Sequence, residues 1–93
     1  MRRFYVNGQA VPRFAKGVRL RHEADGSAML LVPEGALVLN SVAAVALELV
    51  DGTRCLDRIV EDVVDRFDVS TERALEDVRA LFERLTARGF VQC

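Results

Sequence analysis

The fold is decided by residues 30–40, which read Leu30-Leu31-Val32-Pro33-Glu34-Gly35-Ala36-Leu37-Val38-Leu39-Asn40. Two apolar runs flank Pro-Glu-Gly, a combination typical of a tight turn between strands. At the end of the stretch, Asn40 or its neighbour Ser41 can accept a hydrogen bond from an otherwise unpaired backbone N–H and so begin a helix. The stretch therefore predicts a strand, a turn, a second strand and a capped helix.

The apolar and polar residues around this stretch predict a meander of three strands. Residues 18–22 alternate apolar and polar side chains, as a half-buried strand does. Residues 28–32 are apolar throughout, which favours a central strand covered on both faces. Residues 36–39 form the third strand, which we expect at the edge of the sheet with unpaired N–H and C=O groups.

Three helices are expected after the strands. Residues 42–50 contain one charged side chain, so this helix is expected to be the buried one, ended by Gly52. Thr53 can cap a second helix, and Ser70 or Thr71 a third over residues 72–88, closed by Gly89. A short terminal strand can follow at residues 90–91. The apolar stripes comprise Leu56, Ile59, Val60, Val63 and Phe67 in the second helix, and Ala74, Leu75, Val78, Leu81, Phe82 and Leu85 in the third.

This order indicates an α+β fold of the winged helix-turn-helix type, a three-stranded antiparallel meander followed by three helices. We expect one domain over residues 12–93. Residues 1–11 are expected to be an N-terminal extension that forms a hairpin about Asn7-Gly8 or is mobile.

Composition narrows the class of protein. Of the 93 residues, 51% are hydrophobic and 29% charged, as in an ordinary globular protein. The longest uncharged run, residues 35–47, is shorter than the ~20 residues that span a bilayer, and the basic N-terminus lacks the apolar segment of a signal peptide. We therefore expect a soluble, cytoplasmic protein without a membrane partner.

Catalysis is poorly supported. His22 is the single histidine, and no glycine-rich phosphate loop is present. The two cysteines, Cys55 and Cys93, lie in no CxxC or Cys/His cluster, so no metal site is indicated. The acidic residues of the second helix lie off its apolar face, as solvated side chains do. We expect no catalytic residue, metal or cofactor.

Nucleic acid is the obvious rival partner, because winged-helix proteins often read DNA with the second helix of the motif. Here residues 72–88 carry four acidic and four basic side chains, and residues 56–71 carry five acidic and two basic. DNA affinity depends mainly on neutralising phosphates, so a winged-helix regulator is the weaker alternative.

An exposed third strand beside an amphipathic helix suits β-augmentation, in which an extended peptide adds as a further strand. Alternatively the edge is shielded by the N-terminal segment or by a second copy of the protein, so that a monomer and a homodimer are both open. The residues alone do not decide between these readings.

A set of short motifs, ordered over residues 12–91, resembles the PqqD family. Each motif is weak alone, and the order and intervals carry the resemblance. The motifs are Pro12, Gly17-Val18-Arg19-Leu20-Arg21, Leu30-Leu31, Pro33-Glu34-Gly35, Leu39-Asn40, Ala43-Ala44 and Asp51-Gly52, with Asp77-Val78, Leu81, Leu85 and Gly89 later in the chain. Cys55 stands where the family often has serine.

The resemblance implies a RiPP recognition element, a non-catalytic chaperone of pyrroloquinoline quinone (PQQ) biosynthesis. It would bind the ribosomally made precursor PqqA and present it to the radical SAM enzyme PqqE, which links a Glu and a Tyr of the precursor. A related element serving another modified peptide is an alternative. The peptide-binding residues that this implies are Ala36, Leu37, Val38 and Leu39 in the third strand, and Leu75, Val78, Arg79 and Phe82 in the third helix, with Arg79 positioned to pair with a precursor carboxylate.

Overall fold

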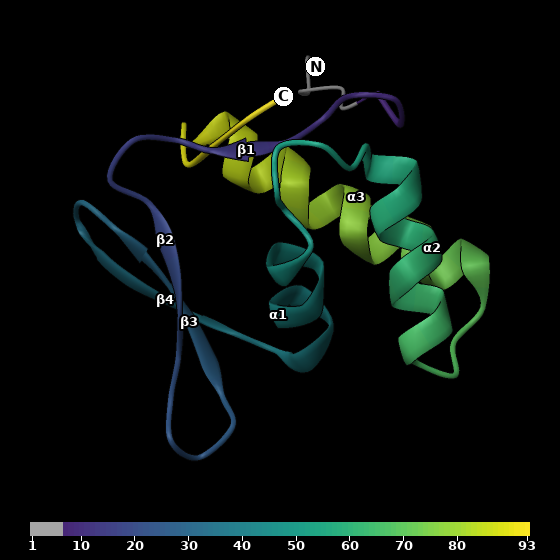
Figure 1. Cartoon of the computed structure of the whole chain (residues 1–93), viewed down its shortest axis with the longest axis horizontal. Helices are drawn as coiled ribbons and strands as arrows, with labels where there is room; N and C mark the ends of the chain where they lie inside the picture. Colours follow the sequence, from purple (N-terminus) through teal and green to yellow (C-terminus); the bar gives the residue numbers. More distant parts are fainter. Residues whose placement is uncertain (1–6) are drawn as a thin grey trace.

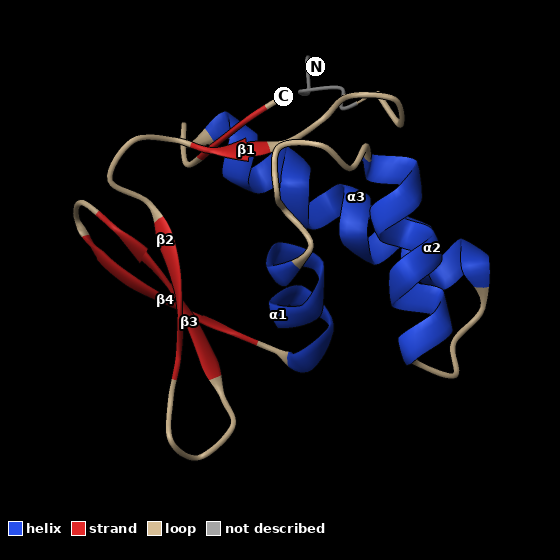
Figure 2. Ribbon diagram, viewed as in Figure 1, coloured by secondary structure: helices blue, strands red, loops and turns tan. Residues whose placement is uncertain are grey.

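A twisted three-stranded antiparallel sheet stands beside three helices in the computed structural model, which describes residues 7–93 (Figures 1 and 2). This architecture confirms the α+β, winged helix-turn-helix-like prediction. The elements are, in chain order, β1 (Arg13–Phe14), β2 (Arg19–His22), β3 (Ala28–Val32), β4 (Gly35–Leu39), α1 (Ser41–Glu48), α2 (Leu56–Arg66), α3 (Thr71–Ala87) and β5 (Val91–Gln92).

The main sheet has the order β2-β3-β4, so β3 is central as predicted. The side chains on the two faces of β3 are buried to different extents, however. Ala28 and Leu30 are buried, whereas Met29 and Leu31, which point to the other face, are only partly covered. The expectation that β3 is covered on both faces is therefore wrong, because the helices pack on one side of the sheet (Figure 2).

Helix α1 begins where the sequence predicts, because the Asn40 side chain accepts a hydrogen bond from the Ala43 N–H at 2.8 Å. It ends at Glu48, two residues before the predicted end at Val50. Nor is it the buried helix, since within it only Ala46 and Leu47 are fully buried. The other apolar side chains of α1 are half-buried, and two of them, Val42 and Ala43, line the groove described below.

Helix α2 begins at Leu56, and the predicted cap by Thr53 is wrong, since that residue bonds to Asp51 instead. The residue in the cap position, Cys55, forms no side-chain capping bond. Backbone carbonyls from the N-terminal segment take its place: Gly8 accepts from the Asp57 N–H at 2.8 Å and Ala10 from the Leu56 N–H at 3.0 Å. Residues 9–11 consequently form no strand. The other half of the predicted hairpin, residues 4–6, lies outside the described residues.

Helix α3 is capped by Ser70, whose hydroxyl accepts from the Arg73 N–H at 3.1 Å. At its other end Gly89 has a φ of 79°, and the N–H groups of Gly89 and Phe90 bond to Thr86 and Leu85. This pattern is the Schellman motif, which requires a left-handed residue that glycine supplies without strain. It turns the chain back so that β5 pairs with β1, a strand that the sequence analysis did not predict.

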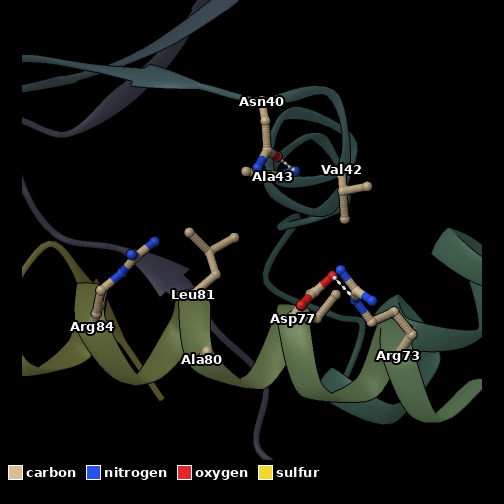
Figure 3. A pocket seen from close by; sticks show the side chains of 9 residues that line it. Asn40, Val42, Ala43, Arg73, Asp77, Ala80, Leu81 and Arg84 are labelled. Atoms are coloured by element: carbon tan, nitrogen blue, oxygen red, sulfur yellow. Dashed lines mark hydrogen bonds and ion pairs between the residues drawn. The ribbon is translucent and has the colours of Figure 1, made fainter.

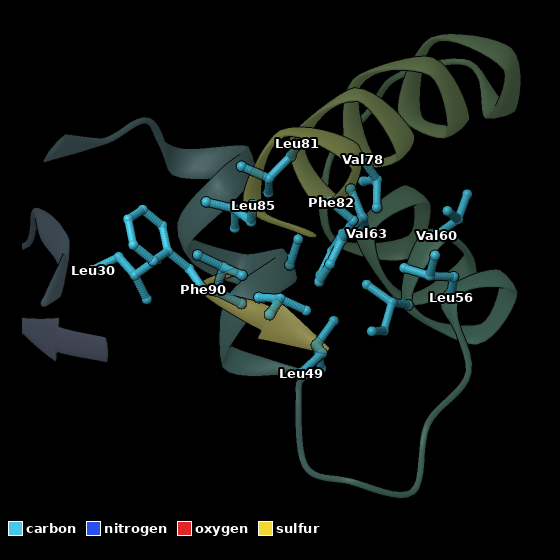
Figure 4. Packing of buried hydrophobic residues seen from close by; sticks show 14 of the residues in the cluster. Leu30, Leu49, Leu56, Val60, Val63, Val78, Leu81, Phe82, Leu85 and Phe90 are labelled. Atoms are coloured by element: carbon cyan, nitrogen blue, oxygen red, sulfur yellow. The ribbon is translucent and has the colours of Figure 1, made fainter. Parts of the chain in front are cut away.

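The core lies between the three helices and the inner face of the sheet (Figure 4). The predicted stripes supply most of it, with two exceptions: Phe67 is partly buried and Leu75 is 36% exposed. The buried members from the helices are Ala46, Leu47, Leu56, Ile59, Val60, Val63, Ala74, Val78, Leu81, Phe82 and Leu85.

Candidate functional site

Strand β4 is an edge strand: it pairs with β3 on one side and with no other strand of residues 7–93. Val32 pairs with Gly35 across the two-residue turn at Pro33-Glu34, and in a hairpin with so short a loop the residues that flank the loop form a hydrogen-bonded pair. Hydrogen-bonded and non-hydrogen-bonded pairs alternate from there along an antiparallel ladder. Leu37 and Leu39 therefore bond to β3, whereas the N–H and C=O groups of Ala36 and Val38 point to the open edge.

A groove runs along this edge between β4, the start of α1, and α3. It consists of two adjoining hollows of about 370 Å³ each, which share Leu81 and Arg84. The first hollow is lined by residues 36–39 together with Leu81, Arg84, Leu85 and Arg88. The second is lined by Asn40, Val42, Ala43, Arg73, Asp77, Val78, Ala80, Leu81 and Arg84 (Figure 3). We call the two together the β4–α3 groove.

The groove has an apolar floor and a charged rim. Leu81 and Leu85 are buried, and Leu37 and Leu39 are half-buried beside them. On the rim, Arg73 and Asp77 form an ion pair at 3.4 Å (Figure 3). Arg84 and Arg88 are exposed, and among residues 7–93 neither forms an ion pair. An apolar floor, open main-chain groups and two available guanidinium groups fit an extended peptide with acidic side chains.

Arg88 also contacts the aromatic ring of Phe90, just beyond the end of α3. Its guanidinium carbon lies 5.2 Å from the centroid of the Phe90 ring, a cation–π geometry. This contact orients the side chain at the end of α3 while leaving its N–H donors accessible.

The structure brings together part of the predicted site. Ala36, Leu37, Val38 and Leu39 all line the groove, and Val78 lies at its floor. Phe82 is fully buried in the core. Leu75 and Arg79 lie elsewhere, in a small hollow with Gly8, Leu56, Asp57 and Val60, on the side of α3 that faces α2 and the N-terminal segment.

Four side chains of α3 that line the groove were not predicted as site residues. Asp77, Leu81, Arg84 and Arg88 follow one another at intervals of four, three and four residues, so they share one face of the helix. This spacing was visible in the sequence. What was lacking was the angle at which α3 lies against the sheet, which depends on its packing against α2.

Several polar features of the described residues lie outside the groove. Within residues 7–93, no group of three or more His, Cys, Asp or Glu side chains is placed to hold a metal ion. His22 is exposed, with its Nε2 3.9 Å from a Glu48 carboxylate oxygen. The N–H groups of Thr53 and Arg54 and the Thr53 hydroxyl lower the pKa of Asp51 to about 2, which marks a loop-organising carboxylate. Over these residues no helix has the length and apolarity needed to cross a bilayer.

Comparison with known proteins identifies the family of this chain. Residues 27–91 match the family model described as coenzyme PQQ synthesis protein D (PqqD). A PqqA binding protein of Rhizobium meliloti is 35% identical, over 94% of this chain and 90% of that protein. A second PqqA binding protein, from Stutzerimonas stutzeri, is 39% identical over 88% of this chain and 89% of that protein.

A solved structure has the same fold. The solution NMR structure of the PqqD truncation of Methylobacterium extorquens PqqCD superposes with a TM-score of 0.81 at 27% identity, covering 96% of each chain. It represents a functional, stand-alone recognition element for ribosomally synthesised and post-translationally modified peptides. With a family model that covers most of its length and relatives that match nearly end to end, this chain belongs to the PqqD family.

Proposed function

We propose that this protein binds the precursor peptide PqqA in PQQ biosynthesis and acts as a peptide chaperone without catalytic activity of its own. The observation that carries the proposal is the open edge of β4 lining a groove with an apolar floor. Relatives that match almost the whole chain are named PqqA binding proteins, which supports the choice of peptide.

The proposed mode of binding is strand addition. An extended segment of the peptide would pair with the outward N–H and C=O groups of Ala36 and Val38, extending the sheet to four strands. Alternate side chains of the added strand would then face Leu81 and Leu85 of α3, where burial of apolar surface contributes affinity. Main-chain bonds supply affinity for any extended segment, so selectivity depends on the side chains of the groove.

The wider role is proposed on the family resemblance. The bound precursor would be presented to the radical SAM enzyme PqqE, in the cytoplasm where a ribosomal peptide is made. Because strand addition occupies only the groove, the outer faces of α2 and α3 remain available for the enzyme.

An NMR titration tests the proposal. Uniformly ¹⁵N-labelled protein is mixed with unlabelled synthetic PqqA, and the amide shifts are followed to saturation. We expect the largest shifts at residues 36–39 and at the α3 residues that line the same hollow, with little change in the exposed end of α2. Saturating peptide that leaves the amides of Ala36 and Val38 unmoved would show that the peptide does not add to β4.

A further inference from the structure

The charged side chains of α3 are distributed unevenly around the helix. Counted through Arg88, the helix carries four acidic and four basic side chains, a net charge of zero. The groove face holds Arg73, Arg84 and Arg88 against Asp77, a net charge of +2. The remaining charged residues, Glu72, Glu76 and Glu83 against Arg79, sum to −2. A helix that is neutral overall therefore presents a cationic face to the groove.

Within the groove the unpaired positive charge is greater in the half beside β4, because Arg84 lines both hollows and Arg88 lines only that one. Arg73 is neutralised by Asp77 in the hollow beside α1. Arg84 and Arg88 lie in the hollow beside β4, where among residues 7–93 no carboxylate pairs with them. Because β4 lies opposite residues 81–88 and the start of α1 opposite residues 73–84, this cationic half is the half in which a peptide would pair with β4.

We infer that the peptide segment that pairs with β4 is acidic, and that Arg84 and Arg88 select it by binding its carboxylates. The inference rests on the proposed function and adds the chemistry of the recognised segment. Side chains four apart on a helix lie about 5–6 Å apart at Cβ. Side chains two apart on one face of a strand lie about 6.8 Å apart, from a rise of about 3.4 Å per residue. The two spacings are similar, and both arginines line the same hollow as residues 36–39, so two carboxylates at alternate positions of the added strand can each reach one of these long side chains.

The test is fluorescence anisotropy with fluorescein-labelled synthetic PqqA and the full chain. Arg84→Gln and Arg88→Gln are each expected to raise Kd about 3- to 10-fold, the range for accessible charge pairs, and the double variant more. Arg66→Gln, at the exposed end of α2 outside the groove, removes the same charge and is expected to leave Kd within twofold. Added salt should weaken wild-type binding more than it weakens the double variant.

Because Arg88 contacts Phe90, a loss of binding at that position needs a control for folding. Arg88→Lys keeps the charge and is expected to recover part of the affinity, and the circular dichroism melt of every variant is recorded. A second PqqA peptide, with its Asp and Glu changed to Asn and Gln, should bind wild type weakly and be insensitive to the arginine substitutions.

The outcomes separate the two proposals. If wild type binds PqqA and the double arginine variant binds equally well, acidic recognition is refuted while strand addition stands. The same holds if the neutralised peptide binds as tightly as the acidic one. If wild type binds no PqqA at all, the proposed function fails, and the inference fails with it.

Discussion

Replacing Val38 with proline is expected to separate peptide binding from folding. The Val38 side chain is 77% exposed, and Val38 lies opposite Met29 in a pair that exchanges no ladder hydrogen bonds. Its N–H points to the open edge, so proline removes a donor that β3 does not use. Proline is tolerated at such edge positions, where the missing N–H would face solvent.

The size of the effect on binding follows from the bond that is lost. A main-chain hydrogen bond contributes about 0.5–1.5 kcal/mol net, and a peptide carbonyl left unpaired against the proline ring costs about 1–3 kcal/mol. The sum, about 1.5–4.5 kcal/mol, raises Kd roughly 10- to 2,000-fold. The free energy of unfolding should change by less than about 1 kcal/mol, as for other exposed substitutions.

Two matched variants complete the experiment. Val38→Thr retains the β-branched shape and the N–H, and should bind PqqA like wild type. Leu37→Pro removes a donor that faces β3, so urea unfolding should show a loss of about 1–3 kcal/mol from the broken bond. Binding is measured by titration calorimetry. A folded Val38→Pro variant with wild-type affinity would refute both the ladder register and strand addition at this position.

Three further substitutions test the scaffold. Leu30→Ala should lower the free energy of unfolding by about 2–5 kcal/mol in urea, because Leu30 is fully buried; a loss under 1 kcal/mol would contradict its place in the core. Cys55→Ser should raise the same free energy by about 0.5–1 kcal/mol, since serine can cap α2 where cysteine does not; no gain would show that Gly8 and Ala10 already suffice. Asp51→Asn should lower the melting temperature at pH 7. The folded-state pKa of Asp51 is depressed, so its contribution is present above about pH 3.8 and lost toward pH 2, where variant and wild type should converge; a pH-independent difference would contradict this assignment.

The sequence predicted the meander because its signals are local. Strand alternation, the Pro33-Glu34 turn and the Asn40 cap each act over a few residues, and each appears in the structure. The start of α2 was misplaced because its cap comes from Gly8 and Ala10, whose carbonyls reach it only after the chain has folded. Local propensity contains no information about such a partner.

The candidate site likewise has one part that local sequence signals predict and one part that depends on tertiary packing. The β4 half could be predicted, because an edge strand follows from strand order. The α3 half could not, because Leu75 and Arg79 belong to the same amphipathic helix as Leu81 and Arg84 but face α2. A hydrophobic stripe shows which side of a helix faces the core. The residues on the two edges of that stripe can still contact different neighbouring elements. Choosing between the two edges requires the packing angle.

The length of the turn between β3 and β4 links the scaffold to the binding edge. Gly35 has a φ of 152°, a conformation that favours glycine, and it allows Val32 and Gly35 to pair across only two residues. That register points the backbone groups of Ala36 and Val38 outward and keeps the side chains of Leu37 and Leu39 half-buried over the groove floor. A shift of the β3–β4 pairing by one residue would reverse the direction of the backbone groups and the faces of the side chains together, since a strand alternates with a period of two. The Pro33-Glu34-Gly35 motif therefore determines which main-chain groups are open to a peptide, although none of its residues lines the groove.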